Sequence, residues 1–396
     1  MTTSVTMASP FDIPLDVPPG ADPDRALPAD LSDPTMVGAA LGALIESGRL
    51  DLPLPAAGST ATRWRALADL AVNDVTLARL ADAHAGAVAI LDDLGGPAPE
   101  RDQRWGVWDV DTPVSPLVAR WGPDGWTLHG ARSSCSGARV LTHALVTAEI
   151  TAVRTGEARQ LFAVRLDDRN IAVAAGGRAS QMMTGADTAT VLFDGAQAVP
   201  VGGPVGTPGR SGAVATYTDR PVFWHAAAGV AACWFGGAIG VARPLFAAGR
   251  LGRADHEGWA DHSAGQYGSA GHHGPAGQHA RPLDARALAH LGRVDALLMA
   301  GRCVLETAAR EIDADPDDAG GSARRRALQV RATIEAGAAE VIDLVGRALG
   351  PGPLCSDRGY ARRVADLGFY LRHSHVEHDL EALAGVVLDD LDPFWW

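Results

Sequence analysis

The chain has 396 residues, a formal net charge of -13, 47% hydrophobic residues and 20% charged residues. All 34 of its basic residues are arginine, which excludes chemistry that requires a lysine, such as a Schiff base or a lysine-dependent phosphate loop. The acidic balance disfavours nucleic acid and anionic membranes as partners, because both bind clustered cationic surface.

Residues 1–34 are rich in proline and aspartate and contain no basic segment followed by an apolar run, which predicts a flexible tail. From 35 to 103 the apolar residues recur at helical spacing, as at Leu67, Leu70 and Ala71. This pattern predicts an N-terminal helical domain.

Residues 104–205 change to short runs rich in β-branched and aromatic residues, such as 105–108, 161–164 and 191–193. Turn signals such as Pro123-Asp124-Gly125 separate these runs. The spacing predicts a middle β-domain, built as an antiparallel sandwich or barrel.

Helical spacing returns after a Gly/Pro-rich hinge and continues through residues 206–396. Four segments of more than twenty residues predict a C-terminal four-helix bundle; they are 226–248, 285–312, 323–349 and 361–388. A Gly/His-rich loop at 249–281 interrupts the bundle. Its five histidines follow no fixed motif and have no carboxylates at ligand spacing, so we expect a polar loop and no metal site.

Cysteine spacing and hydropathy indicate the compartment. The four cysteines lie far apart, without the close pairs of a zinc site or the density of a disulfide framework. No run approaches the roughly eighteen uninterrupted apolar residues of a membrane-spanning helix. We therefore expect a cytoplasmic protein that does not enter a membrane.

Four motifs, in this order of helices, strands and helices, resemble the acyl-CoA dehydrogenase family over about residues 35–390. They are LARL at 77–80 with His84, WDVDTP at 108–113, WTLHGARSSCSGA at 126–138, and Gly350-Pro351-Gly352 with Arg363 and Asp366. The resemblance implies an α+β fold with an N-terminal helical domain, a middle antiparallel β-domain and a C-terminal four-helix bundle.

The resemblance also implies FAD, or FMN in its place, between the β-domain and the bundle. One side of the flavin edge would be lined by Trp108, Val110 and Asp111. The other side would be lined by Ser134, Cys135 and Ser136. A rigid strand that offers backbone groups and one hydroxyl suits the ring, because flavin N3-H donates and N5 accepts or donates with the redox state.

Some positions depart from the family pattern. Asp111 stands where the family has a hydroxyl residue, Ser134 replaces a bulky aromatic, and Arg132 stands in place of a lysine. The Arg-x-x-Phe-Gly segment that reaches the cofactor of a neighbouring subunit is not found, so the dinucleotide half of FAD has no identified anchor.

The resemblance places the catalytic base in the run 369–381, where the family has a glutamate. Here Ser374 takes that position, flanked by His373 and His375. Histidine transfers protons near neutral pH, and it lies near the site in some flavin monooxygenases of this fold. On a helix His375 shares a face with His378, and Glu377 or Glu381 could orient an imidazole; the alternative is a polar helix surface or subunit contact.

Trp224 and His225, at the start of the bundle, are candidate substrate-binding residues, with core packing as the alternative. Three functions stay open: a flavin oxidoreductase acting on an acyl thioester or a specialised small molecule, a flavin monooxygenase using reduced flavin and oxygen, and a non-catalytic assembly partner. The resemblance further implies a homodimer or homotetramer and a flavin reductase or electron-transfer partner.

Overall fold

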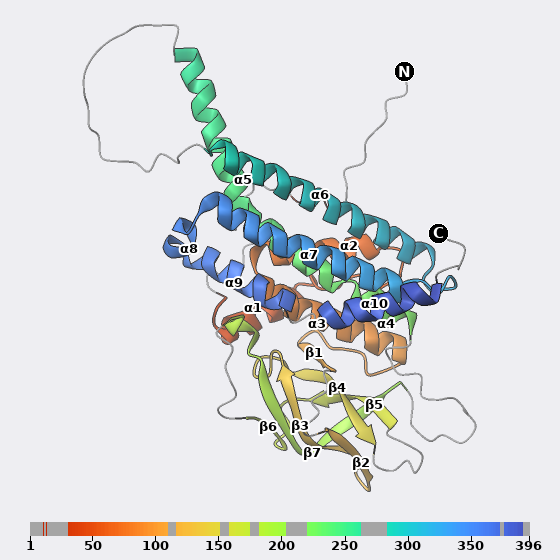
Figure 1. Ribbon diagram of the computed structural model, residues 1–396. Helices are drawn as coiled ribbons and strands as arrows, with labels where there is room; N and C mark the ends of the chain where they lie inside the picture. The colour runs from red at the N-terminus through yellow and green to blue at the C-terminus, as the bar shows by residue number, and fades with distance from the viewer. Residues whose placement is uncertain are drawn as a thin grey trace.

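The computed structural model describes residues 11, 13, 31–109, 116–150, 158–174, 182–202, 220–262, 283–372 and 376–390. Its helices form a layered body on one side, and its strands form a sheet on the other (Figure 1). The sheet segment lies between two helical segments in sequence, as predicted.

Three helices precede the sheet, and side chains cap the starts of the first and the third. They are α1 (Pro34–Glu46), α2 (Thr60–Asn73) and α3 (Val75–Leu94). The Asp33 carboxylate accepts from the Thr35 amide at 2.7 Å and so caps α1. Asp74 caps α3 in the same way through the Leu77 amide at 2.8 Å, and Gly95 ends that helix in the left-handed conformation.

Seven strands form one sheet in the order β1-β4-β2-β3-β7-β5, with β6 on β7 and a further β4–β5 pairing that closes the sheet on itself. They are β1 (Trp105–Trp108), β2 (Val118–Gly122), β3 (Gly125–Cys135), β4 (His143–Ile150), β5 (Ala158–Arg165), β6 (Ile171–Val173) and β7 (Ala189–Val201). The expectation of a purely antiparallel sheet is wrong, because β4 pairs in parallel with both β1 and β2. The β2–β3 hairpin acts as the crossover that lets β4 return in the direction of β1.

Seven helices follow the sheet within the described residues. They are α4 (Pro221–Ala227), α5 (Val230–His262), α6 (Ala285–Ala314), α7 (Ala323–Leu349), α8 (Gly352–Ser356), α9 (Arg358–Arg372) and α10 (Val376–Asp390). The predicted start of the Gly/His-rich loop at 249 is wrong, because α5 continues to His262 even though Gly249, Gly252 and Gly258 are weak helix formers. The predicted helix 361–388 corresponds to α9 and α10, with 373–375 outside the described residues.

The helices on the two sides of the sheet segment form one packed body. α2 and α5 meet backbone to backbone: a Cβ built on Gly236 would lie 2.1 Å from the Ala68 carbonyl oxygen, and one on Gly240 would lie 2.4 Å from that of Val72. Only glycine permits so close an approach. One hydrophobic core runs from α1 through the sheet to α9.

Three apolar residues of the predicted tail, Phe11, Ile13 and Leu31, are buried in this core. The expectation of a loosely attached segment is therefore wrong at these positions, because burial of their side chains ties the chain down. The segment Pro221–Leu251 is long and apolar enough to cross a membrane by composition, but 67% of its most apolar window is buried within the structure, as in a core helix.

Candidate functional site

The two predicted flavin-contacting strands, β1 and β3, end at the same place. The indole Nε1 of Trp108 donates to the backbone oxygen of Ser136 at 3.0 Å. The Ser136 hydroxyl lies 3.1 Å from that of Thr188, just before β7. The structure thus brings Trp108 and Ser136 together; Val110 and Asp111 lie outside the described residues.

The neighbouring residues on β3 differ in what they offer. Ser134 is exposed and has a positive φ of 58°, which presents its backbone at the surface of the strand end. The Cys135 side chain is buried and donates to the Arg132 carbonyl oxygen at 3.3 Å. Burial raises the pKa of this thiol to about 12, so Cys135 is a packing residue and not a nucleophile.

A short turn, 183–188, connects this strand end to the helical body. It contains the 3-10 helix η2 (Thr184–Ala186), flanked by Met183 and Asp187, which have φ values of 50° and 43°. The Gly137 amide donates to the Ala186 oxygen at 2.6 Å, which ties the turn to the end of β3. Left-handed residues other than glycine cost energy and recur at functional sites.

Asp366 holds the helical side of the same turn. Its carboxylate accepts from the Met183 amide at 2.6 Å and from the Thr76 hydroxyl at 3.3 Å, and Arg362 lies 3.6 Å away. Desolvation raises the pKa of this buried acid. Asp366, predicted as a family landmark, therefore joins α9, α3 and the turn.

Charged side chains gather inside the helical body next to the turn. We call this group the interior charged cluster; it consists of Arg63, Arg79, Asp82, Arg331 and Tyr370. Arg79 touches the turn directly, because its guanidinium lies 3.8 Å from the sulfur of Met183. The five residues 184–188 therefore connect Met183, beside the cluster, to the start of β7.

Asp82 is the carboxylate of this cluster. Desolvation raises its pKa to about 6, although the positive charges of Arg63 and Arg331 oppose the shift. No hydrogen bond or salt bridge holds it within the described part of the chain. A carboxylate of this pKa exchanges protons near neutral pH.

Arg331 lies beside the ring of Trp234, which in turn packs against the ring of Tyr370. Arg331 makes a salt bridge with Asp379 of α10 at 2.7 Å, and its guanidinium lies 5.6 Å from the centre of the Trp234 ring. Trp234 packs edge-on against Tyr370, with the ring centres 6.0 Å apart. The buried Nε1 of Trp234 has no hydrogen-bond partner among the described residues.

The predicted catalytic residues His373, Ser374 and His375 lie outside the described residues. The helices on both sides of them contact the cluster, because Tyr370 of α9 belongs to it and Asp379 of α10 pairs with its Arg331.

The side chains proposed to orient an imidazole lie elsewhere. His378 and Glu381 face each other at 3.8 Å with side chains 82% and 84% exposed, and Glu377 is also exposed. The orienting role predicted for Glu377 or Glu381 therefore has no support in the fold of α10, whose charged residues mostly face solvent.

Trp224 and His225 lie on α4, which packs against α7. His225 is buried, with Nε2 3.2 Å from the Pro316 backbone oxygen, and desolvation lowers its pKa. Trp224 is half-buried beneath the Arg324 guanidinium, 5.5 Å from the ring centre. These contacts match packing at the α6–α7 connection.

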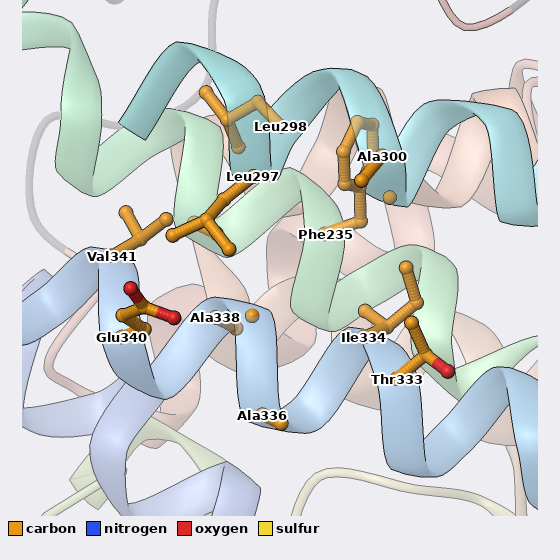
Figure 2. Close-up of a pocket in the computed structure, with 13 residues that line it drawn as sticks. Phe235, Leu297, Leu298, Ala300, Thr333, Ile334, Ala336, Ala338, Glu340 and Val341 are labelled. Carbon is orange, nitrogen blue, oxygen red and sulfur yellow. The ribbon is translucent and has the colours of Figure 1, made fainter. Parts of the chain in front are cut away.

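The described residues line two pockets, one of which borders Arg63 of the cluster. One, of about 240 Å³, is an apolar groove over α5 between α6 and α7, lined by residues such as Phe235, Leu297 and Ile334 (Figure 2). Its one acid, Glu340, is paired with Arg293 at 2.8 Å. The other, of about 140 Å³, lies beside α3 and includes His84 and the outer side of Arg63.

No protein-family model and no curated protein sequence matches the chain. Solved structures match it over nearly its whole length. The nitrososynthase from Micromonospora carbonacea var. africana is 18% identical with a TM-score of 0.67, covering 96% of this chain and 99% of that one. TdsC from Paenibacillus sp. A11-2, crystallised with FMN and indole, is 19% identical with a TM-score of 0.66, covering 91% and 97%.

KijD3, crystallised with FMN and dTDP-3-amino-2,3,6-trideoxy-4-keto-3-methyl-D-glucose, is 16% identical with a TM-score of 0.62, covering 90% of this chain and 83% of that one. At identities of 16–19% the likeness shows a shared fold. TdsC and KijD3 were both crystallised with FMN, and the shared fold agrees with the resemblance that the sequence motifs carry.

Sequence reasoning missed Arg79, Asp82 and Arg331. A signal for two of them was present, because Arg79 and Asp82 stand three residues apart on a helix whose other residues are mostly apolar. Charges on such a helix must face either solvent or a polar interior, and the chain alone does not tell which.

Proposed function

We propose that this chain is a flavin-dependent monooxygenase that uses FMN and acts on a small molecule. The observation that carries the proposal is the fold, shared over 91–96% of the chain with enzymes that include FMN complexes and a dibenzothiophene monooxygenase. A flavin reductase would supply the reduced cofactor, and we propose a homo-oligomer in the cytoplasm.

The residues at the junction of sheet and helices suit a flavin. Ser134 and Ser136 keep exposed surface at the strand ends. On the helical side, the turn 183–188 meets Asp366 of α9 at this junction. When bound there, FMN would supply the electron transfer and the reaction with oxygen.

We assign proton transfer to Asp82. Its carboxyl oxygen would hold a proton at slightly acid pH and release it near neutrality, since the pKa is raised to about 6. Arg63 and Arg331 limit that rise and keep the group from being permanently neutral.

Asp82 also favours a second candidate, dehydrogenation of an acyl thioester. Such a reaction needs a base for the α-proton. The Asp82 carboxylate in the cluster supplies one, although Ser374 stands where the family has its glutamate.

Three measurements separate these functions. Purified protein is first loaded with FMN or FAD; a chain that takes up neither flavin refutes both enzyme functions and leaves the assembly partner. Anaerobic bleaching of the bound flavin by an acyl thioester supports dehydrogenation. Product formation that requires NAD(P)H, a flavin reductase and oxygen supports the monooxygenase, and its absence with all three present refutes it.

The variant Asp82→Asn tests the proton-transfer role, with Asp379→Asn as the control for an acid that already has a salt bridge. The proposal expects Asp82→Asn to flatten the acid limb of the pH–rate profile while flavin binding persists. An unchanged profile would remove Asp82 from the mechanism.

A further inference from the structure

Arg79 is a cation inside the helical body that lacks a counter-charge. Its guanidinium contacts the sulfur of Met183 at 3.8 Å and lies 5.2 Å from the centre of the Tyr370 ring. Neither group carries a negative charge, and no carboxylate lies within salt-bridge distance of Arg79 in the described ranges. Desolvation lowers its pKa, which reflects the cost of that position.

Neighbouring buried arginines are supported differently. Arg331 pairs with Asp379 at 2.7 Å, and Arg362 pairs with Asp74 at 2.6 Å. Arg63 donates to the Pro53 carbonyl oxygen at 3.1 Å and faces Asp82.

Asp82 does not neutralise Arg79, although the two stand three residues apart on α3. The charges that act on Asp82 are those of Arg63 and Arg331, while the group that acts on Arg79 is Tyr370. Within the cluster and its salt bridge, three arginines therefore face two acids, Asp82 and Asp379. The uncompensated positive charge falls on Arg79, and burying a cation without a partner is costly.

Next to Arg79 the structure holds a second polar group without a partner. Tyr370 contacts both Arg79 and Trp234, and the buried indole Nε1 of Trp234 has no acceptor among the described residues. A ligand bearing negatively charged oxygens would satisfy the Arg79 guanidinium, which is a donor only.

We propose that Arg79 binds the acidic group of an organic anion, so that the substrates of this chain are small carboxylic acids, with Tyr370 and Trp234 as the aromatic wall of the same site. The inference rests on the proposed function for the reaction, but the binding step is measurable without it.

The test uses matched acid and amide probes, benzoate with benzamide and hexanoate with hexanamide, titrated calorimetrically into flavin-free and FMN-loaded protein. Charge-assisted hydrogen bonds to a buried guanidinium predict that at least one acid binds about 10- to 100-fold more tightly than its amide. Inorganic phosphate is titrated in parallel. Phosphate that binds as tightly as the preferred acid would show a general anion site and overturn the carboxylic acid assignment.

Variants locate the contact. Arg79→Gln should abolish the preference for the acid, and Arg79→Lys should retain part of it, because lysine keeps the charge but loses the planar pair of donors. Arg293→Gln removes an exposed arginine from the surface pair with Glu340 and should change nothing. Circular dichroism and thermal melting check that each variant is folded, and Arg79→Lys keeps the test valid if Arg79→Gln is not.

Three results would overturn the proposal. The first is that neither acid binds more tightly than its amide, which includes the case that neither binds at all. The second is a preference for the acid that survives Arg79→Gln, and the third is a loss of FMN affinity in Arg79→Gln with acid binding unchanged. The last result would assign Arg79 to the flavin and leave the proposed function standing. Conversely, tight acid binding by a chain that takes up no flavin would refute the function and keep the site.

Discussion

Replacing His84 with asparagine should make the stability of the protein less sensitive to acid. His84 is buried on α3, and its Nδ1 accepts from the Trp105 amide at 3.2 Å, so the ring joins the helical body to the first strand. An asparagine Oδ1 can accept from the same amide. The substitution therefore removes the titration and keeps the contact.

The magnitude follows from the pKa of the ring. Desolvation lowers the pKa of His84 from 6.5 to about 4, with Asp51 opposing and Arg63 reinforcing the shift. Because the folded pKa is depressed, the unfolded chain takes up the proton first as pH falls. The neutral imidazole therefore contributes fully to the stability of the protein above pH 6.5. At lower pH the linkage relation gives a loss of stability of about 2 kcal/mol at pH 5 and about 3 kcal/mol at pH 4.

Urea unfolding at about pH 7.5 and about pH 5 measures this loss as a difference between two variants. The wild-type chain should lose about 2 kcal/mol more than His84→Asn between those conditions. His378→Asn, at a side chain that is 82% exposed, serves as the matched control and should follow the wild type. Equal losses in wild type and His84→Asn would refute the assignment of a neutral, buried imidazole.

Four further substitutions test the packing and the site by urea unfolding. As pH rises from about 4 to 7, Asp82→Asn should gain up to about 3 kcal/mol of stability relative to the wild type. The raised pKa of Asp82 means that the folded wild-type chain disfavours the charged acid, which the variant cannot form. Parallel curves of stability against pH would contradict this. Gly236→Ala should lower the free energy of unfolding by about 1–3 kcal/mol, because its Cβ meets the α2 backbone. Gly337→Ala, at a position with open space around it, should raise the free energy of unfolding by about 0.5–1 kcal/mol. Equal effects of the two substitutions would contradict the close approach of α2 and α5. Asp366→Ala should cost about 1–3 kcal/mol by leaving the buried Met183 amide unpaired, and a neutral result would show that the turn does not depend on it.

The periodic spacing of hydrophobic residues predicted much of the secondary structure. The run 105–108 is β1, and the predicted helix 323–349 is α7 to the residue. Strand pairing was not predictable in the same way, because alternation gives the faces of a strand but not its neighbour or its direction. The parallel partners of β4 depend on how the β2–β3 hairpin folds across the sheet.

The candidate site was predicted only where a motif marked it. Trp108 and Ser136 follow recognisable sequences, and the structure places them in contact. Asp82 lies in no motif, and Arg79 has no assigned role in the LARL motif; the importance of both comes from helices α5, α7 and α9, which enclose them from distant parts of the chain. Such enclosure is a tertiary property that local spacing does not encode.

The backbone contact between α2 and α5 has a consequence for synthesis of the protein. Every strand of the sheet leaves the ribosome after α2 and before α5, so the apolar face of α2 has no partner until the whole sheet has been made. The N-terminal helices thus have to remain unaggregated while about 150 intervening residues emerge, which takes roughly 10 to 30 seconds at ordinary translation rates. A chain released within the sheet segment would expose that face permanently, so truncation before α5 should give an insoluble product and not a smaller folded domain.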